Sequence, residues 1–381
     1  MDVINAGRLG IICTTEEYAR SLVDPTAIQC LTRGESIGLT IVCEAGLLSL
    51  VAVSYIYTII LRNMAWRLRC LHSEKLVIFH QPMDLLMFSL FSADLLQGIG
   101  AVMDIRWIHL GKVEVGSFCT SQGIIQQLGE TGVGMTTLLI AVYTFLGIWI
   151  GKNIRSVRVT GCILAVVWTF IVLMVALGNA TNKGKHYESP TPYWCWIGQG
   201  YLQWRIWGEY IWFWITLVVS FFIYIPLYFW SRGNINIDDK SWWRFSFQRS
   251  DPHASPTLKV VRRQALAMLA YPVVYCISIL PLSIVRWITF VHPDSVSSTG
   301  TFVVTTIFGL SGAANAVLLL TTRPNSGLFS KTIEFTSGRA PSVLMQELGP
   351  MHDQNYSDRA DGSEYHTHDD DSGLGRLPSR N

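Results

Sequence analysis

Residues 119–149 read CTSQGIIQQLGETGVGMTTLLIAVYTFLGIW, an apolar run with a regular set of polar side chains. At a rise of about 1.5 Å per residue, a helix of this length crosses a bilayer with some tilt. Five polar residues recur at intervals of four or seven and therefore share one helical face: Gln122, Gln126, Glu130, Thr137 and Thr144. Because a carboxylate that faces lipid costs several kcal/mol, this face is expected to point into a helical bundle. Four glycines offer small surfaces for close helix packing: Gly123, Gly129, Gly132 and Gly134.

The composition of the whole chain indicates a membrane protein. Half of the 381 residues are apolar and only 15% are charged, and 14 are Trp. A soluble domain rarely combines so few charges with such long uninterrupted apolar runs. The pattern predicts an all-α membrane protein, a seven-transmembrane helix bundle. Its spans are expected at 36–61, 84–107, 119–149, 157–177, 208–230, 266–289 and 301–322.

The distribution of basic residues orients this bundle. Most of the Lys and Arg outside the spans lie in the loops after spans one, three and five, and after span seven. The positive-inside rule then places the N-terminus outside and the C-terminus in the cytoplasm. The sequon Asn179-Ala180-Thr181 falls in an outer loop, so a glycoprotein modified at Asn179 is expected.

Three regions follow from this topology. Residues 1–35 form an extracellular N-terminal segment, and residues 36–323 form the seven-transmembrane domain. Residues 324–381 are rich in Asp, Ser, Gly, His and Arg, and this composition predicts a mostly disordered cytoplasmic tail. Apolar residues within 325–335 recur at intervals of four and seven, which predicts a short amphipathic helix on the inner membrane face.

The cysteines predict one disulfide and leave a second open. Cys119 begins the third span on the outer side, and Cys195 lies in the loop before the fifth. Both face an oxidising compartment, so a bridge between them is expected to hold the second outer loop over the bundle. Cys13 and Cys30 also lie outside, and the sequence alone does not determine whether they pair.

Ionisable and amide side chains within the spans predict an intramembrane polar network. Asp94 and Asn315 lie at similar depth above the inner face, and Glu44 lies nearer the outer face. Intramembrane ionisable residues are candidates for function by default. The alternative is that these groups only satisfy one another and fix the packing.

A second group of polar and aromatic residues predicts an outer ligand pocket. Its members come from the third span, the sixth span and the segment around Cys195: Gln126, Gln127, Glu130, Trp194, Trp196, Arg286 and Trp287. The aromatic side chains offer flat apolar walls, and the Arg286 guanidinium suits a carboxylate or phosphate. Glu130 is expected to pair with Arg286 until an anionic ligand competes for the arginine. The alternative is a permanent network that only specifies packing.

Basic residues at the inner rim are candidates for contact with a cytoplasmic partner. A ligand-gated receptor of seven spans would open a cavity between spans three, five and six, where the C-terminal helix of its partner enters. The candidates at this rim are Lys152, Arg155, Arg262 and Arg263. They serve equally well as positive-inside anchors, and this alternative stays open.

Other membrane classes fit less well. A retinal-binding pump needs a lysine in its last span, and residues 301–322 contain none. An intramembrane zinc hydrolase needs histidine ligands within its spans, whereas the nine histidines here lie in loops, tails or span ends. We therefore expect no enzymatic activity, no metal and no cofactor. Related halves with broken helices, common in transporters, are not visible.

Four stretches resemble a known receptor family: LFSADLLQGIGAVMDIRW (90–107), CTSQGIIQQLGETGVGMTTLLIAVYTF (119–145), LPLSIVRW (280–287) and LSGAANAVLLLTTRP (310–324). They resemble fungal seven-helix receptors grouped with glucose-sensing and cyclic-AMP-receptor-like G-protein-coupled receptors. The inner-face signatures of rhodopsin-like receptors are absent, because the third span ends in IWIGKNIR and Asn315 precedes Ala316 instead of Pro. The third inner loop is also shorter than in glucose-sensing members.

The resemblance implies a plasma-membrane receptor that transduces an extracellular nutrient or small-molecule signal. Its expected partners are a heterotrimeric G protein at the cytoplasmic face, a small-molecule ligand at the outer face and membrane lipids. A homodimer is compatible with this reading, and nucleic acid is not expected. The alternative function is a small-solute transporter or channel. The sequence specifies neither the ligand nor the Gα subunit.

Overall fold

The computed structural model describes residues 10–70, 79, 81–149, 156–182, 186–232, 234–238, 241–247, 256–292 and 295–322. The cytoplasmic tail, the helix expected at 325–335 and the loop with Lys152 and Arg155 lie outside these residues.

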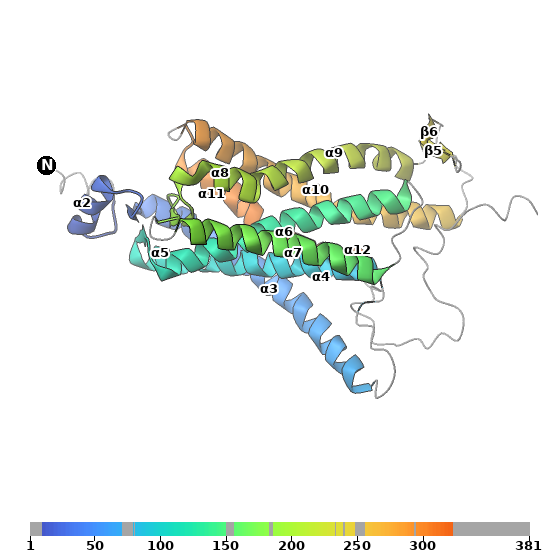
Figure 1. Cartoon of the computed structure of the whole chain (residues 1–381), viewed down its shortest axis with the longest axis horizontal. Coiled ribbons are helices and arrows are strands. Elements are labelled where there is room, and N and C mark those ends of the chain that lie inside the picture. Colours follow the sequence, from blue (N-terminus) through green and yellow to red (C-terminus); the bar gives the residue numbers. More distant parts are fainter. Residues whose placement is uncertain are drawn as a thin grey trace, which may run out of the picture. The chain divides into compact units, whose positions relative to one another are not determined.

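Helices dominate the described chain. In order they are α2 (Thr15–Val23), α3 (Arg33–Cys70), α4 (Pro82–Val102), α5 (Ile105–Leu110), α6 (Ser117–Ile148), α7 (Val157–Thr181), η1 (Gln199–Tyr201), α8 (Leu202–Arg205), η2 (Ile206–Tyr210), α9 (Ile211–Ser231), α10 (Pro256–Val291), α11 (Ser298–Gly309) and α12 (Ser311–Thr322). Seven helical segments of the described residues are long and apolar enough to span a membrane: Arg33–Trp66, Pro82–Leu110, Ser117–Ile148, Val157–Thr181, Gln199–Ser231, Ala270–Val291 and Ser298–Thr322. They lie side by side as a bundle (Figure 1), which confirms the predicted seven-helix membrane fold.

Helix α6 lies at the centre of this bundle, as its polar face predicts. Of its most apolar window 67% is buried, against 22% for α7 at the periphery. It packs against α4, α7, α9 and α10. At Gly129 an added Cβ would lie 2.5 Å from the backbone nitrogen of Gln97, so only glycine allows α4 and α6 to approach this closely. Four members of the polar face are buried: Gln122, Gln126, Thr137 and Thr144. The fifth, Glu130, is partly exposed.

Three spans contain breaks that the sequence does not predict. The second span continues from α4 into α5, and the seventh changes from α11 to α12 at Leu310. The fifth begins earlier than expected, with η1, α8 and the wide π-helical turn η2 ahead of α9. Such turns rotate side chains out of the regular helical register and are frequent at functional sites. Here the turn carries Glu209.

Three antiparallel strand pairs complete the described chain: β1 (Ile28–Cys30) with β2 (Lys112–Glu114), β3 (Glu188–Pro190) with β4 (Cys195–Ile197), and β5 (Ile235–Asp238) with β6 (Ser241–Phe247). The last two pairs are hairpins, whereas three helices separate β1 from β2 in the chain. Strand β1 packs with α2, and β3 and β4 pack on α6. The β5–β6 hairpin lies at the end of the bundle opposite α2 (Figure 1). The first two strand pairs form a cap at the end of the bundle that is expected to face outside.

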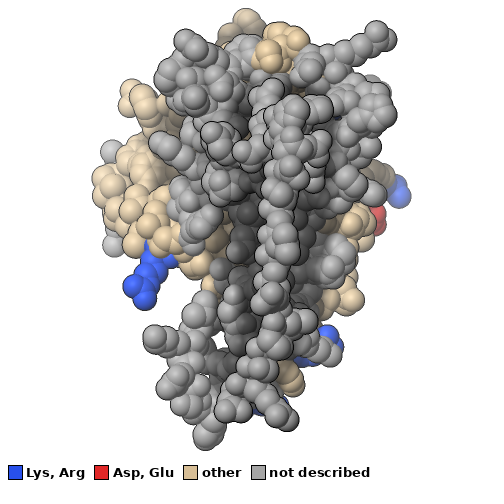
Figure 2. All heavy atoms as spheres, turned by 90° about the vertical axis from the view of Figure 1, so that its right-hand side faces the viewer, with Lys and Arg blue, Asp and Glu red and all other residues tan. Residues whose placement is uncertain are grey.

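The end opposite this cap carries exposed basic side chains. Figure 2 looks at this end and shows more Lys and Arg than Asp and Glu at its margin. Exposed arginines lie near the ends of three helices there: Arg62 and Arg69 on α3, Arg158 on α7 and Arg232 after α9. This distribution agrees with the orientation expected from the positive-inside rule.

Candidate ligand-binding site

The second outer loop is fastened to the start of α6. Cys119 and Cys195 form a disulfide with a Cα–Cα distance of 5.2 Å, which confirms the predicted pair. Strands β3 and β4 pair from Pro190 opposite Cys195 to Glu188 opposite Ile197. This hairpin is buried along its length, so it forms a fixed lid on the bundle.

Gln122 joins the lid to two spans. Its Oε1 accepts from the backbone N–H of Cys195 at 3.1 Å and from Trp107 Nε1 at 2.6 Å. Its Nε2 donates to Asp104 Oδ1 at 2.6 Å and to the Gly100 carbonyl at 3.3 Å. All four bonds are buried, so this glutamine fixes β4 relative to the ends of α4 and α6.

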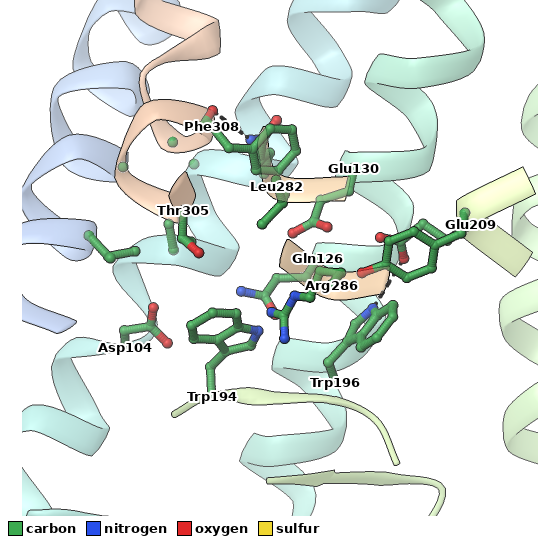
Figure 3. A pocket seen from close by; sticks show the side chains of 17 residues that line it. Asp104, Gln126, Glu130, Trp194, Trp196, Glu209, Leu282, Arg286, Thr305 and Phe308 are labelled. Carbon is green, nitrogen blue, oxygen red and sulfur yellow. Dashed lines mark hydrogen bonds between the residues drawn. The ribbon is translucent and has the colours of Figure 1, made fainter. Parts of the chain in front are cut away.

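Beneath the lid lies a cavity of about 40 Å³, enough for a few water molecules. Side chains from α3, α4, α6, β4, the fifth span, α10 and α11 line it (Figure 3). Its polar lining residues are Gln97, Asp104, Gln126, Glu130, Glu209, Tyr210, Arg286 and Thr305, together with the indoles of Trp194 and Trp196. The cavity thus reaches six of the seven spans.

Arg286 lies between two indole rings of the lid (Figure 3). Its guanidinium carbon is 4.7 Å from the ring centroid of Trp194 and 5.9 Å from that of Trp196. Arg205 lies 4.9 Å from the centroid of Trp196 and donates to the Ile197 carbonyl. Cation–π contacts of this kind hold a guanidinium without using all its N–H donors.

The predicted Glu130–Arg286 ion pair is wrong. Within the described residues, the only ion pairs closer than 4.0 Å are those of Lys112. Glu130 instead lies beside Glu209, whose Oε2 accepts from Trp196 Nε1 at 3.1 Å. Two adjacent carboxylates repel each other when both are ionised, which favours a proton held by the pair. Arg286 is near enough to act on both carboxyls electrostatically.

Two amide oxygens in the cavity lining have no donor among the described residues. They are Gln97 Oε1 and Gln126 Oε1. A buried acceptor left unpaired costs about 1–3 kcal/mol. A cavity with such acceptors, a carboxyl pair and a guanidinium is therefore suited to a small polar ligand with both donors and acceptors.

The structure brings together five of the seven predicted pocket residues: Gln126, Glu130, Trp194, Trp196 and Arg286. The other two predictions are wrong. Gln127 is buried against Gly208, away from the lining, and Trp287 is 49% exposed on the outer surface of α10. A helix turns by about 100° per residue, so neighbours of a pocket residue face elsewhere.

Two residues of the cavity lining, Asp104 and Glu209, are not among those predicted from the sequence. Asp104 follows the apolar run of α4, and Glu209 lies ahead of the apolar run of α9, so both resemble residues at a span end. One signal was available for Glu209, because it interrupts the aromatic sequence WGEYIW. A carboxylate among aromatic residues needs a partner inside the protein.

The deeper polar network is confirmed in part. Asn315 Nδ2 donates to Asp94 Oδ2 at 3.0 Å, and both residues are buried. The assignment of Glu44 to this network is wrong, because its side chain is exposed on the face of α3 that is directed away from the bundle. The coupling candidates remain predictions: Lys152 and Arg155 lie outside the described residues, and so do the side chains of Arg262 and Arg263 on α10.

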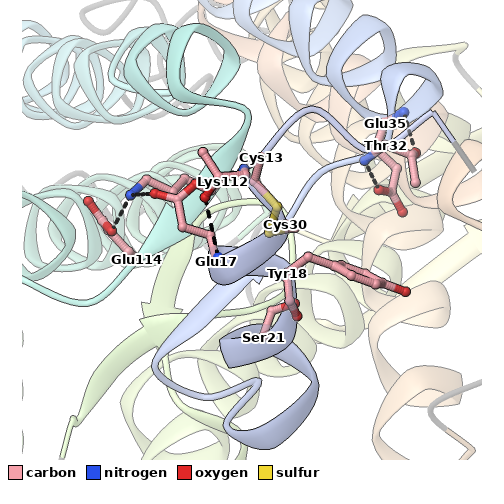
Figure 4. Close-up of a disulfide and its surroundings, with 10 residues drawn as sticks. Cys13, Glu17, Tyr18, Ser21, Cys30, Thr32, Glu35, Lys112 and Glu114 are labelled. Carbon is pink, nitrogen blue, oxygen red and sulfur yellow. Dashed lines mark hydrogen bonds and ion pairs between the residues drawn. A yellow bond between two sulfur atoms is a disulfide. The ribbon is translucent and has the colours of Figure 1, made fainter. Parts of the chain in front are cut away.

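The N-terminal segment forms a second part of the cap (Figure 4). Cys13 and Cys30 are disulfide-bonded with a Cα–Cα distance of 5.8 Å. Lys112 Nζ lies 2.7 Å from Glu17 Oε1 and 2.8 Å from Glu114 Oε2. The bond from Lys112 lowers the pKa of Glu17 to about 2, and the bonds from Glu114 and Glu17 raise the pKa of Lys112. This segment is therefore tied to the loop after the second span.

Glu188 is a buried carboxyl in the lid. Burial raises its pKa to about 7, while a bond from Asn179 Nδ2 at 3.4 Å partly offsets this. Asn179 Nδ2 also donates to the Val175 carbonyl at 3.1 Å. Glycosylation at Asn179 remains a prediction, and a glycan on this nitrogen would replace one of its two N–H donors and so remove at least one of these bonds.

Comparison with protein-family models gives no match for this chain, and comparison with curated proteins gives none.

Proposed function

We propose that this protein is a plasma-membrane receptor that carries an outer small-molecule signal to a heterotrimeric G protein and the cyclic AMP pathway. The observation that supports this most is the course of α10, one helix from Pro256 to Val291. It contributes Arg286 to the cavity beneath the lid, and its other end carries Arg262 and Arg263 toward the inner face. A contact made at one end can therefore act on the other.

The cavity offers a physical means of switching. A ligand shifts a conformational equilibrium only if its contacts differ between the two states. An anionic group bound by Arg286 would draw the guanidinium from the Glu130–Glu209 pair, whose proton occupancy then changes. Pro281 lies five residues before Arg286 in α10, where the missing backbone N–H makes bending easier. Binding would thus change the bend of α10 at Pro281, and this change would move the inner end of the helix.

The resemblance to fungal glucose-sensing and cyclic-AMP-receptor-like receptors supports the same function. The resembling stretches include Gln126, Glu130 and Arg286, which line one cavity. That family couples to heterotrimeric G proteins, and the coupling is carried over to this chain as a proposal.

The decisive experiment measures nucleotide exchange on Gα. The full chain and a heterotrimeric G protein are reconstituted in vesicles, and exchange is followed with panels of sugars, nucleotides, organic acids and amino acids. Receptor-dependent exchange, whether basal or raised by a panel member, supports the proposal. The matched variant neutralises Lys152, Arg155, Arg262 and Arg263 together and should abolish exchange. Exchange by the intact chain no faster than from empty vesicles contradicts the proposal.

A transporter is the second candidate, and the Glu130–Glu209 pair favours it specifically. A carboxyl pair that holds a proton within a membrane bundle is a common element of proton-coupled transport. The same vesicles distinguish the two functions. Uptake of a panel solute with concurrent proton movement, and without nucleotide exchange, would replace the receptor proposal.

A further inference from the structure

One face of α3 carries a regular stripe of exposed side chains. Its members follow at alternating intervals of four and three residues: Ile37, Ile41, Glu44, Leu48, Val51, Tyr55, Thr58 and Arg62. The five large apolar or aromatic members are each more than half exposed. The opposite face of α3 buries Leu39, Val53 and Ile56 in the bundle. The bundle itself therefore leaves this stripe uncovered.

The spacing of the stripe is that of a helix–helix seam. Alternation of four and three gives a mean period of 3.5 residues, which is the repeat of left-handed helix pairs. Helix pairs in membranes commonly cross at about 20° with this geometry. From Ile37 to Arg62 the repeat continues without interruption. A second helix can therefore follow the stripe along the span.

Glu44 lies within this stripe, between Ile41 and Leu48. It follows the start of α3 by eleven residues, which places it roughly 16 Å along the helix, well inside a bilayer. Among the described residues it has no hydrogen bond and no ion pair. A carboxyl at this depth that contacts only lipid costs several kcal/mol. The stripe therefore calls for a protein partner with a polar group at the same depth.

We propose that the stripe is the interface of a parallel homodimer in which Glu44 of each copy bonds to Glu44 of the other. A two-fold axis normal to the membrane brings each residue of the stripe to its own counterpart at the same depth. The carboxyl is self-complementary there, because a protonated carboxyl donates and accepts at once. The apolar residues on either side exclude water from the pair. A different partner would have to supply a donor at that depth.

The test is the monomer–dimer equilibrium of the full chain in vesicles, followed by single-molecule photobleaching over a range of protein-to-lipid ratios. Glu44→Leu should raise the dissociation constant roughly tenfold, as expected for a lost interhelical hydrogen bond in a membrane. Glu44→Gln, which keeps a self-complementary amide, should stay within about threefold of wild type.

Two neighbouring residues give a matched control. Leu48→Ala lies on the stripe and should weaken the dimer, whereas Leu47→Ala, exposed beside the stripe, should leave it unchanged. A wild-type chain that is monomeric at all ratios overturns the proposal. Dimers unaffected by Glu44→Leu overturn it too, because the interface then lies elsewhere. The proposal and its test are independent of G-protein coupling.

Discussion

Two clusters of buried polar residues lie in this bundle, and they are packed in opposite ways. Around Asp94 and Asn315 the space is filled: a Cβ added at Gly312 would overlap Ser49 and lie 3.1 Å from Asp94 Cβ. Around Glu130, Glu209 and Arg286 a cavity of about 40 Å³ remains. Both clusters interrupt apolar spans, yet only the outer one leaves room beside its polar groups.

The difference separates a structural role from a binding role. A filled cluster fixes how helices pack, and a ligand has no space to enter it, even though Asp94 Oδ1 has no hydrogen-bond partner among the described residues. A cluster with a cavity, an incompletely used guanidinium and unpaired amide oxygens retains capacity for further hydrogen bonds. The comparison favours a packing role for the Asp94–Asn315 pair, and the space beside the outer cluster supports the ligand-binding role proposed for it.

Opening the disulfide that holds the lid over the outer cluster should have the largest effect on stability. Cys195→Ser opens a disulfide between residues separated by 76 positions, and loss of such a bridge costs about 2–5 kcal/mol. We expect a lower Tm in detergent and reduced surface expression. Cys162→Ser, which changes an exposed free thiol on α7, is the control and should match wild type. Equal Tm values for both variants would contradict the clamping role of the bridge.

Glu188 should make the outer end sensitive to pH. Its pKa in the folded protein is about 7, above the ordinary value of 4.5, so the folded state binds the proton more tightly. Stability from this group is therefore complete below about pH 4.5 and is lost as pH rises toward 7. The shift corresponds to at most about 3 kcal/mol. Thermal unfolding between pH 5 and 8 should show a falling Tm.

Glu188→Gln isolates this effect, since the amide cannot ionise. The variant should lose much of the fall in Tm over the same pH range, and the difference between the two curves measures the contribution of Glu188. Parallel curves for the variant and wild type would show that Glu188 does not titrate in this range.

The inner cluster should respond to loss of one partner. Asn315→Leu removes the donor to Asp94 Oδ2 and leaves a buried carboxyl unpaired, at a cost of about 1–3 kcal/mol. The double variant Asp94→Leu with Asn315→Leu should recover part of this loss. A double-mutant cycle on Tm checks the coupling. Strictly additive losses would mean that the hydrogen bond does not hold the two spans together.

The sequence predicts the bundle well, because span length, charge distribution and the polar face of residues 119–149 each carry physical constraints. It also predicts Cys119–Cys195, since both thiols face one compartment. It fails where local geometry decides which way a side chain faces. Trp287 follows Arg286 by one residue and turns outward, and the π-helical turn brings Glu209 into the cavity. The prediction for Glu44 fails because depth along a helix does not specify which face of the helix a side chain occupies.

The smallest change in stability should accompany the clearest change in activity. Glu130→Gln and Glu209→Gln keep the shape of the carboxyl pair and its ability to hydrogen-bond, and they lie beside a cavity that accommodates adjustment. Each should therefore shift the free energy of unfolding by less than about 1 kcal/mol, below the cost of about 1–3 kcal/mol for a buried polar group left unpaired. Each variant removes one ionisable member of the pair, so the electrostatic balance with Arg286 changes, and basal nucleotide exchange on Gα should change with it. Trp287→Leu is the control, because that indole lies outside the cavity and its loss should leave exchange unaltered.

If both glutamine variants are folded and exchange at the wild-type rate, with and without a stimulating ligand, the carboxyl pair is structural. The outer cluster would then differ from Asp94 and Asn315 only in its packing.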